Sequence, residues 1–558
     1  MTKTLHPIIH QHKLWRKLEI LPGVLTWTGL LFPFVISIFS PVFAASCIIV
    51  YTMFWLFRSF KFCLNLTRSL KRVQKAEKTN WNEWINFVDC PEKIDYEIKK
   101  LSKQSDSQKI VEEYEELKKQ IEVLKNHHQY KKSKEMMHAL LYVTYKESWE
   151  VIEQSLESYV ASDYPSTNMI LVFAGEEGDK ENFLAMSEKA KAKFGAKFKD
   201  FIVTVHPKNI PGEIKGKSAN ATFASRALKK YLDEKGIAYD NVMLSNFDAD
   251  TVVNHGYFSE LTYRYLVTLD RTEMAYQPTP MFHNNIWDVP MMMRIIAQGC
   301  TFWAMAESME PDKYKSFSSR SLSFQTAVEI DFWDTSIIPD DSRQYWTAYV
   351  VYSGRHHVLP IYSPVYMDAV LSATYVKTFQ SQYRQLRRWA WGVCDFPFLA
   401  INLWYNKNIN FWVKIKHMTT FLRDSFFWAT GPILLSVMGF IPTWVNPGFR
   451  DQVLAYNLPK MMSDLLTIAS MGIVLCAIIS LALVPRHPKK GLIGYLSLCL
   501  QWLLVPPVSI FLSALPALEA QTRLMLGRYL EIEFNVTEKA RKEHASKHLP
   551  TRPAKLTR

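Results

Sequence analysis

Three short polar motifs carry the side chains of this chain that are best suited to chemistry. Asp248-Ala249-Asp250 and Pro339-Asp340-Asp341 supply carboxylates, and Gln385-Leu386-Arg387-Arg388-Trp389 supplies an amide, fixed cations and an indole ring. The third motif lies shortly before a block of hydrophobic segments. Each motif can arise by chance, so their order along the chain beside that block is the more specific signal.

Asp248 and Asp250 form a candidate metal site. They are separated by one residue, directly after the apolar run Val242-Met243-Leu244. At the end of a strand, this spacing can bring both carboxylates to one divalent ion that is bound to a nucleotide diphosphate. Mg²⁺ and Mn²⁺ prefer such oxygen ligands and complete their shell with phosphate oxygens and water. A solvated polar turn is the alternative interpretation, and the preceding apolar run favours the metal site.

Asp341 is the candidate catalytic base. Transfer of a group to a hydroxyl with inversion requires a carboxylate on the acceptor side, which takes the hydroxyl proton as the new bond forms. The alternative is that Asp340, Asp341 and Ser342 cap the N-terminus of a helix.

The third motif suits a departing anion and an acceptor. Arg388 offers a fixed positive charge to a leaving diphosphate. Trp389 offers a flat wall for an acceptor, and Gln385 offers a hydrogen bond. If residues 385–389 are helical, Gln385 and Trp389 lie on one face with Arg388 beside them. A basic, aromatic helix at the membrane surface is the other interpretation, and both can hold together.

In this order the motifs resemble those of the membrane-bound, inverting family 2 glycosyltransferases, which include the cellulose and hyaluronan synthases. Residues 143–147 are similar to the family's first-strand nucleotide motif, and residues 215–220 to the segment that faces the nucleotide sugar. Residues 534–539 have the Phe-x-Val-Thr-x-Lys form of the gating loop that closes over the nucleotide in cellulose synthases. The family's base is the Asp of a Thr-Glu-Asp or similar motif; Asp341 matches it, and Asp340 stands where Glu is common.

The resemblance implies an α/β domain of the GT-A type (Rossmann-like) on the cytosolic side, joined to an α-helical transmembrane bundle. It also implies roles for the matching residues: Asp341 as base; Tyr145, Glu147, Glu176, Lys217, Asp248 and Arg388 for the nucleotide sugar; Asp248 and Asp250 for Mg²⁺ or Mn²⁺; Gln385 and Trp389 for the acceptor; Phe534, Val536, Thr537 and Lys539 in the gating loop.

One segment departs from the family pattern. The family's second strand ends in Asp-Asp-Gly, where an Asp contacts the base of the nucleotide, whereas this chain has Gly175-Glu176-Glu177-Gly178. Glu176 and Glu177 are both candidates for that role. The donor is therefore open, and a UDP-sugar is what the family leads us to expect.

The composition indicates a membrane protein with a large soluble domain. Hydrophobic residues make up 48% of the 558 residues, yet the mean hydropathy is only −0.09, so apolar residues must be concentrated in blocks. The formal net charge of +13 fits a positive-inside topology and anionic lipid headgroups. No nucleic-acid-binding motif accompanies it, so membrane lipids are the expected partners. The seven cysteines are scattered without a Cys-x-x-Cys pair, which suits a reducing cytosolic face.

Hydrophobic segments lie at both ends of the chain. Residues 21–40 and 41–57 are each near the length of a spanning helix, and the basic flank that follows places both ends of this hairpin in the cytosol. Residues 425–445 and 465–484 are further spanning candidates. Residues 491–518 are too long for one simple crossing and contain Pro506-Pro507. We expect that segment to turn back or to end short of a full crossing, because the basic tail after it should stay cytosolic.

Between these segments, apolar runs alternate with helical periodicity. Runs at 139–145, 169–173, 201–205 and 242–246 predict strands, and 148–160 and 218–232 predict helices. This alternation indicates an α/β domain around a mostly parallel sheet, with ligands beyond the carboxyl ends of the strands. Residues 110–124 show a short heptad-like seam, which predicts either a coiled coil or, as we favour, a helix packed on its own domain. The polar residues within 282–288 suggest a loop that faces the acceptor.

The expected organisation is 1–61, a transmembrane hairpin; 62–136, a charged helical linker; 137–400, the glycosyltransferase domain; 401–422, an interfacial helix; 423–520, C-terminal transmembrane helices; 521–558, a basic cytosolic tail with the gating loop.

The expected function is sugar transfer with inversion from a nucleotide-diphosphate sugar to a glycan or lipid hydroxyl at the cytosolic membrane face. The acceptor is extended processively into a polysaccharide or receives a single sugar. A transporter or scaffold without catalysis is the alternative, but it explains the hydrophobic helices and not the ordered polar motifs. A hydrolase with paired carboxylates would not require Arg388 or the membrane block.

Overall fold

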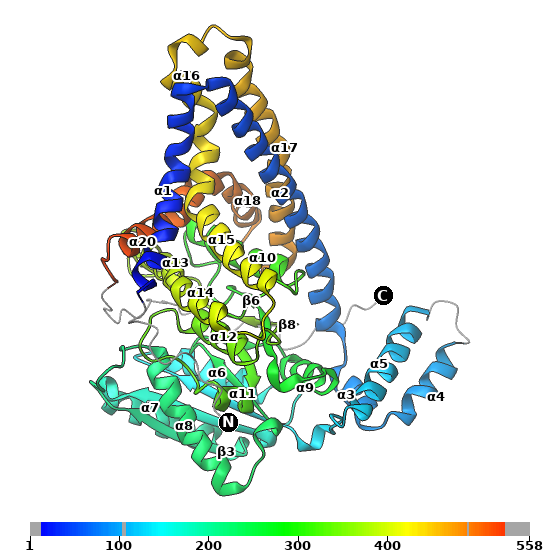
Figure 1. Cartoon of the computed structure of the whole chain (residues 1–558). Helices are drawn as coiled ribbons and strands as arrows, with labels where there is room; N and C mark the ends of the chain where they lie inside the picture. The colour runs from blue at the N-terminus through cyan, green and yellow to red at the C-terminus, as the bar shows by residue number, and fades with distance from the viewer. Residues whose placement is uncertain (1–12, 103–107, 488–489, 531–558) are drawn as a thin grey trace.

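The computed structural model describes residues 13–102, 108–487 and 490–530. An α/β domain forms one end of the molecule, and a bundle of long helices rises from it (Figure 1). The gating-loop residues Phe534, Val536, Thr537 and Lys539 lie outside the described residues.

An eight-stranded mixed sheet forms the centre of the domain. Its order is β3-β2-β1-β4-β7-β6-β8-β5. The strands are β1 (Met137–Val143), β2 (Met169–Glu176), β3 (Asp200–His206), β4 (Val242–Phe247), β5 (Val252–Val253), β6 (Ala275–Met281), β7 (Arg320–Ser323) and β8 (Val358–Tyr366). The first four run parallel to one another, in the 3-2-1-4 order of a doubly wound nucleotide-binding sheet. The four predicted strands correspond to these four.

The prediction of a mostly parallel sheet holds for β1 to β4 and is wrong for part of the remaining sheet, β5 to β8. β7 pairs antiparallel with β4 and β6, and β5 pairs antiparallel with β8. β7 has no continuous apolar run that would predict a strand. Its Ser321 instead lies 2.7 Å from the Ser245 hydroxyl on β4, so the pairing is supported by a buried polar contact.

Helices cover both faces of the sheet. They are α6 (Trp149–Val160), α7 (Lys180–Phe194), α8 (Lys217–Lys235), α9 (Tyr257–Val267), α10 (Met291–Glu307), α11 (Phe324–Glu329), α12 (Asp340–Val351), α13 (Tyr375–Ala390) and α14 (Phe396–Tyr405). Side chains of α8 and α11 form the core on one face, and those of α6, α7 and α9 form the core on the other. Because both faces are covered, β1, β2 and β4 are continuous apolar runs.

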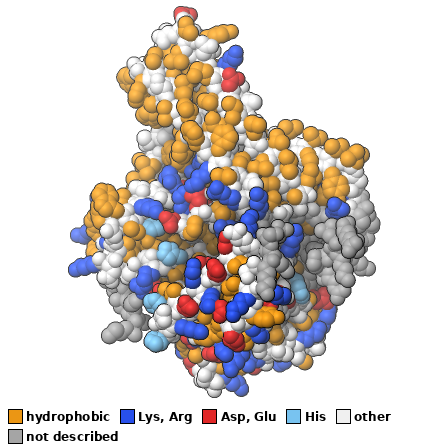
Figure 2. All heavy atoms as spheres, turned by 90° about the vertical axis from the view of Figure 1, so that its right-hand side faces the viewer, with side chains coloured by type: hydrophobic (Ala, Val, Ile, Leu, Met, Phe, Trp, Pro, Cys, Tyr) orange, Lys and Arg blue, Asp and Glu red, His pale blue; other side chains and the backbone are white. Residues whose placement is uncertain are grey.

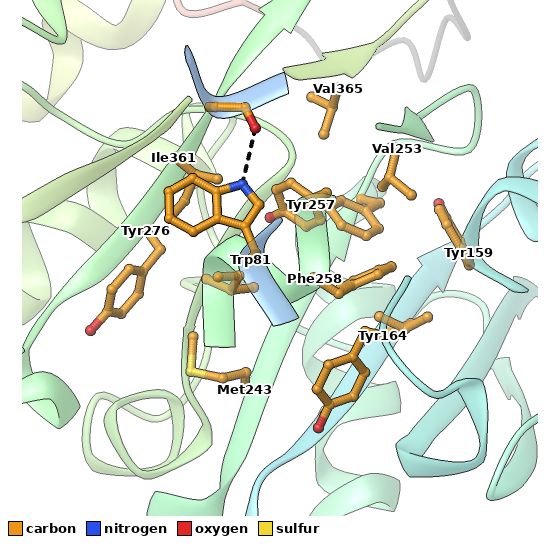
Figure 3. Close-up of a cluster of buried hydrophobic side chains, with 14 of the residues drawn as sticks. Trp81, Tyr159, Tyr164, Met243, Val253, Tyr257, Phe258, Tyr276, Ile361 and Val365 are labelled. Atoms are coloured by element: carbon orange, nitrogen blue, oxygen red, sulfur yellow. Dashed lines mark hydrogen bonds between the residues drawn. The ribbon is translucent and has the colours of Figure 1, made fainter. Parts of the chain in front are cut away.

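Aromatic side chains dominate the second of these cores. Trp81 of α3 (Trp81–Asp89) lies among Tyr257, Phe258 and residues of the sheet, and its indole N–H donates to the carbonyl of Ala76 at 3.1 Å (Figure 3). Tyr159 of α6 belongs to the same cluster and is fully buried. The chain between the hairpin and the domain is therefore part of the folded unit.

The heptad-like seam packs within its own chain, as we favoured. It forms α5 (Gln108–Asn126), which lies beside α4 (Glu92–Leu101). Tyr114, Leu117 and Ile121 are buried, and the Tyr114 ring contacts Trp84 and Phe87.

Four long helices rise from the domain: α1 (Trp15–Phe39), α2 (Pro41–Lys78), α15 (Phe411–Val437) and α17 (Val453–Leu483) (Figure 1). The turn between α1 and α2 and the short α16 (Ile441–Val445) lie together at the far end, where Asn446 donates to the carbonyl of Ser37 at 3.3 Å. Figure 2 shows hydrophobic side chains over most of this projection and charged side chains below it. Residues 401–422, expected as one interfacial helix, belong to the end of α14 and the start of α15.

Residues 492–525 form a fifth apolar helical segment. Five helices of the described chain are long and apolar enough to span a membrane, and this is one of them. It comprises α18 (Leu492–Leu500), α19 (Val505–Ser509) and α20 (Leu515–Met525), joined by 3-10 and π turns. The chain therefore stays helical through Pro506-Pro507. We predicted that the segment would either turn back there or end short of a full crossing, and it does not turn back.

Both ends of this segment contact the α/β domain. Near its start, Ser497 accepts a hydrogen bond from Arg294 of α10 at 3.1 Å. Near its end, Glu519 accepts from Arg387 of α13 at 2.7 Å. A helix that crossed the membrane would have its ends about 30 Å apart along the normal, so the segment runs along the domain and does not accompany the four long helices to their far end.

This arrangement predicts four crossings, and cysteine labelling checks it. In a background without native cysteines, Asn446→Cys should react with a membrane-impermeant reagent from one side. Ser336→Cys, on the domain, and Leu526→Cys, just after α20, should both react from the other side. Labelling of Leu526→Cys on the same side as Asn446→Cys would show that residues 492–525 cross.

Candidate functional site

One large cavity lies between the carboxyl edge of the sheet and the long helices. Its volume is about 2990 Å³. The cavity is lined by ten of the residues predicted for the site: Tyr145, Glu147, Glu176, Lys217, Asp248, Asp250, Asp341, Gln385, Arg388 and Trp389. These side chains come from segments far apart in the sequence, and the fold brings them to one space.

Hydrogen bonds from the core fix the turn that carries Asp248 and Asp250. Tyr142 and Ser155 donate to the carbonyl of Ala249 at 2.6 and 2.8 Å, and Tyr159 donates to the carbonyl of Thr251 at 3.1 Å. Each bond of this kind contributes about 1 kcal/mol. The two carboxylates are thus held in place by the buried aromatic cluster under the sheet.

The carboxylates of the turn have different surroundings. Asp250 is 2% exposed, and its Oδ2 accepts a hydrogen bond from the backbone N–H of Asp368 at 2.7 Å. Asp248 is half-buried and accepts from Lys217 Nζ at 2.6 Å and from the Ser318 hydroxyl. Asp368 also lines the cavity. We did not predict it, although its place just after β8, at an end of the sheet, was the available signal.

Lys217 connects the two acidic motifs. Burial lowers the pKa of Lys217, but the carboxylates of Asp248, Asp341 and Asp340 outweigh this effect, so the pKa lies above its ordinary value. Lys217 is the first residue of α8, and the free N–H groups at a helix N-terminus favour anions. Three residues on, the side-chain amide of Asn220 lines the cavity, is fully buried and has no hydrogen-bond partner in the described chain. This end of α8 is suited to a phosphate-bearing ligand.

The donor set fits a divalent cation in part. Asp248 already holds a cation, the Lys217 ammonium, at 2.6 Å. No cluster of three or more His, Cys, Asp or Glu side chains in the described chain could hold a metal by itself. Mg²⁺ is commonly bound through one or two carboxylates together with substrate phosphates. Asp248 and Asp250 therefore suit a metal that arrives with a diphosphate.

Asp340 and Asp341 begin α12 at the cavity wall. Asp341 forms an ion pair with Arg320, which is almost fully buried and also donates to Gln344. Asp340 has no guanidinium of its own, and burial together with the neighbouring Asp341 carboxylate raises its pKa to about 7. Arg320 therefore pairs with Asp341, and Asp340 is the carboxyl whose protonated form is favoured. Arg320 was not predicted, because an isolated Arg in β7 carries no sequence signal.

The third motif lies on the last turns of α13. Residues 385–389 are helical, as the predicted arrangement of Gln385 and Trp389 on one face requires. Arg388 and Trp389 are exposed to the cavity. Arg387 also lines the cavity, and together with Arg523 it holds Glu519 of α20, each at 2.7 Å. This ion-pair network attaches the motif to residues 492–525.

The ends of the first three strands complete the cavity edge. Glu147 accepts from the Thr144 hydroxyl at 2.6 Å and from the backbone N–H of Tyr145. It therefore shapes the turn that presents Tyr145, in addition to lining the cavity.

The structure distinguishes the two glutamates after β2. Glu176 lines the cavity, whereas Glu177 accepts from the backbone N–H of Lys208 at 2.8 Å. His206, at the end of β3, lies between Glu176 and Glu213 at 3.1 and 3.0 Å. The hydrogen bond with Glu176 is the largest influence on His206 and raises its pKa, against the effect of burial. We missed His206, although it occupies the same edge as the predicted residues.

The loop at 282–288, expected to face an acceptor, mainly braces the site. Asn284 donates to the carbonyl of Asp250 at 3.0 Å, and Asn285 exchanges hydrogen bonds with the backbone of Ala369. Trp287 donates to the carbonyl of Pro485 at 2.8 Å. Of this loop only Phe282 lines the cavity, so polarity alone was a poor guide here.

Comparisons with known proteins give weak likenesses. No protein-family model and no curated protein matches the sequence. Among solved structures, mannosyltransferase PcManGT from Pyrobaculum calidifontis, in complex with GDP-Man and Mn²⁺, is similar at 16% identity and a TM-score of 0.35, over 60% of this chain and 86% of that one. S. aureus TarS is similar at 13% identity and a TM-score of 0.30, over 60% and 55%. TarS 1-349 in complex with UDP is similar at 12% identity and a TM-score of 0.30, over 60% and 90%.

Proposed function

We propose that this chain is an integral membrane glycosyltransferase of the inverting, family 2 type with a GT-A-like domain. It transfers a sugar from a nucleotide-diphosphate sugar, with UDP as the expected nucleotide, to a hydroxyl of a glycan or lipid acceptor. The carrying observation is that one cavity, bounded by the sheet edge and the long helices, is lined by Asp248, Asp250, Lys217, Asp341 and Arg388 together. A transporter or scaffold has no need of these groups in one place.

The donor side is formed by the strand ends and α8. Glu176 lies where a carboxylate can accept from the N–H groups of a nucleobase. The N-terminus of α8, Lys217 and Asn220 suit the diphosphate. Asp248 and Asp250 would hold a Mg²⁺ or Mn²⁺ ion, which neutralises the charge of the leaving diphosphate when it is bound.

The acceptor side is formed by α12 and α13. The acceptor hydroxyl attacks the anomeric carbon from the face opposite the diphosphate; the new carbon–oxygen bond forms as the bond to the diphosphate oxygen breaks. The hydroxyl proton passes to Asp341, the carboxylate that pairs with Arg320. Arg388 stabilises the departing diphosphate, and Trp389 and Gln385 border the space for the acceptor.

We expect this chemistry on the cytosolic side of the membrane. The basic residues that follow the hydrophobic part of α2, among them Arg68, Lys71 and Arg72, favour the cytosol under the positive-inside rule. With four crossings, the chain after α20 lies on the same side as Asp248 and Arg388. A gating loop at 534–539, as the family resemblance implies, requires this side, and processive synthesis of a polysaccharide would use it.

A panel of nucleotide sugars tests the proposal. Purified protein in detergent with Mn²⁺ should release nucleotide diphosphate from at least one sugar donor, and addition of the correct acceptor should increase the rate. No release above background from any donor, with or without membrane extract as acceptor source, would contradict an assignment as a glycosyltransferase.

Asp341→Asn should lower the rate of transfer by a factor of about 10² to 10⁴, because a positioned base is lost. Binding of nucleotide diphosphate should stay nearly unchanged, since the base acts on the acceptor. Calorimetry and turnover would be measured together, with Asp331→Asn as a control that neutralises an exposed carboxylate. Loss of nucleotide binding in Asp341→Asn would show that its role is on the donor side.

The raised pKa of Asp340 predicts that the rate of sugar transfer depends on pH. Below about pH 7 Asp340 is protonated, so the acceptor side loses the negative charge beside the base Asp341. The rate should fall as the pH drops through this value. In Asp340→Asn the rate should fall only at lower pH, because the carboxyl with the raised pKa is absent. An unchanged pH–rate profile in Asp340→Asn would exclude this coupling.

A further inference from the structure

The cavity narrows into a charged region beside the long helices. Arg58 and Lys61 of α2, Lys315 before β7 and Arg423 of α15 line it, and we refer to this region as the neck. The neck is thus bordered by two long helices and by the segment before β7 of the α/β domain. With α2 and α15 crossing a membrane, a junction of this kind corresponds to the lipid headgroups.

Most acidic residues in the neck already have partners. Glu310 pairs with Lys61 at 2.8 Å and also with Lys313. Asp424 pairs with Arg423 at 2.8 Å. Glu307 is the remaining carboxylate; burial, with Glu310 and Asp424 nearby, raises its pKa and so disfavours its ionised form.

Two cations of the neck have aromatic rings, and not carboxylates, as their nearest interaction partners. Lys315 Nζ lies 4.7 Å from the ring centre of Trp346 and 5.5 Å from that of Phe421. The guanidinium of Arg58 lies 5.5 Å from the ring centre of Trp55. Among the described residues, no carboxylate is within ion-pair distance of Lys315 or Arg58. Neither cation forms an ion pair with a described residue; burial lowers the pKa of Lys315, and Asp424 and Glu307 act on it only at longer range.

The neck is bordered by two of the long helices. α2 and α15 touch through Trp55 and Phe427, whose ring centres are 5.6 Å apart. The guanidinium of Arg58 lies 5.7 Å from the ring centre of the same Phe427. Phe54 and Phe57 line the cavity near the contact and are 40% and 66% exposed. The wall beside the cations is therefore apolar, as the acyl part of a lipid requires.

The neck is connected directly to the reacting groups. Lys315 lies three residues before Ser318, whose hydroxyl donates to Asp248. Its ring partner Trp346 belongs to α12, the helix that begins with Asp340 and Asp341. A molecule held by Lys315 would therefore extend toward the acceptor side of the site.

We propose that the neck, bordered by α2 and α15, binds the phosphate headgroup of a membrane lipid, and that this phospholipid is the acceptor. Arg58 and Lys315 bind the phosphate, the acyl chains stay beside Phe54 and Phe57, and a hydroxyl elsewhere on the headgroup reaches Asp341. Basic pockets between helices at the membrane surface bind such headgroups. The role as acceptor rests on the proposed sugar transfer, whereas binding of the phospholipid does not.

Photolabelling of the purified full-length protein in an uncharged detergent tests the binding. The probe is phosphatidylinositol with a photoactivatable group on one acyl chain, and labelled peptides are identified by mass spectrometry. Labels should map to α2 around residues 54–61 or to α15 around residues 421–427. Unlabelled phosphatidic acid should compete, and uncharged diacylglycerol should not.

Loss of either cation should weaken this labelling. Lys315→Gln and Arg58→Gln should each raise the probe concentration for half-maximal labelling about tenfold, the effect of losing one charge-assisted hydrogen bond, and Lys315→Arg should restore it. Lys416→Gln is the matched control, because Lys416 lies on α15, is exposed and pairs with Asp312 outside the cavity. The competition with wild-type protein decides the question even if one variant fails to fold.

Three results would overturn the proposal. Equal competition by diacylglycerol would show that only the acyl chains are recognised. Equal competition by inorganic phosphate at the same concentration would show that the site takes free anions and not a lipid. Protection by an uncharged oligosaccharide, with none by phosphatidic acid, would assign the neck to a glycan acceptor. Absence of nucleotide diphosphate release from every donor would instead reject the sugar transfer and leave the lipid binding to be judged by the labelling.

Discussion

The site depends on an excess of negative charge at the carboxyl edge of the sheet. Asp248, Asp250, Asp340 and Asp341 lie near this edge, where Lys217 pairs with Asp248 and Arg320 pairs with Asp341. Neighbouring carboxylates in a buried space disfavour each other's ionised forms unless positive charge is added. The raised pKa of Asp340 and the tight pairing of Asp248 with Lys217 are two expressions of the same constraint. The uptake of a divalent cation together with the donor would be a third consequence of this negative charge.

The rest of the fold holds this charge in place. Tyr142, Ser155 and Tyr159 bind the backbone around Ala249 from the aromatic core below the sheet. β7 carries Arg320 to the wall where α12 begins. The pairing of Arg387 with Glu519 attaches α13 to residues 492–525, so the cations of α13 are positioned by the helical part of the molecule. The α/β domain and the helices therefore form one site between them.

The sequence alone was sufficient to predict those features of the fold and site that depend on local apolar runs and short motifs. The strands β1 to β4, the hairpin of α1 and α2 and the cavity positions of Asp248, Asp341 and Arg388 follow from such patterns. It was insufficient where tertiary contacts decide. Arg320 and Asp368 have no motif of their own, and their positions depend on the antiparallel β7 and on the end of β8. The path of residues 492–525 could not be read from hydropathy, because lying along a domain and crossing a bilayer require similar apolar residues.

Calorimetric titration of wild-type protein with nucleotide diphosphate tests the central claim most directly. The excess carboxylate charge predicts tight binding in Mn²⁺ or Mg²⁺ and very weak binding in EDTA, because without the metal the diphosphate would face Asp248 and Asp250 uncompensated. Equal affinity in both conditions would contradict the account, since it would mean that Lys217 and the N-terminus of α8 suffice for the diphosphate and that the paired carboxylates have another purpose.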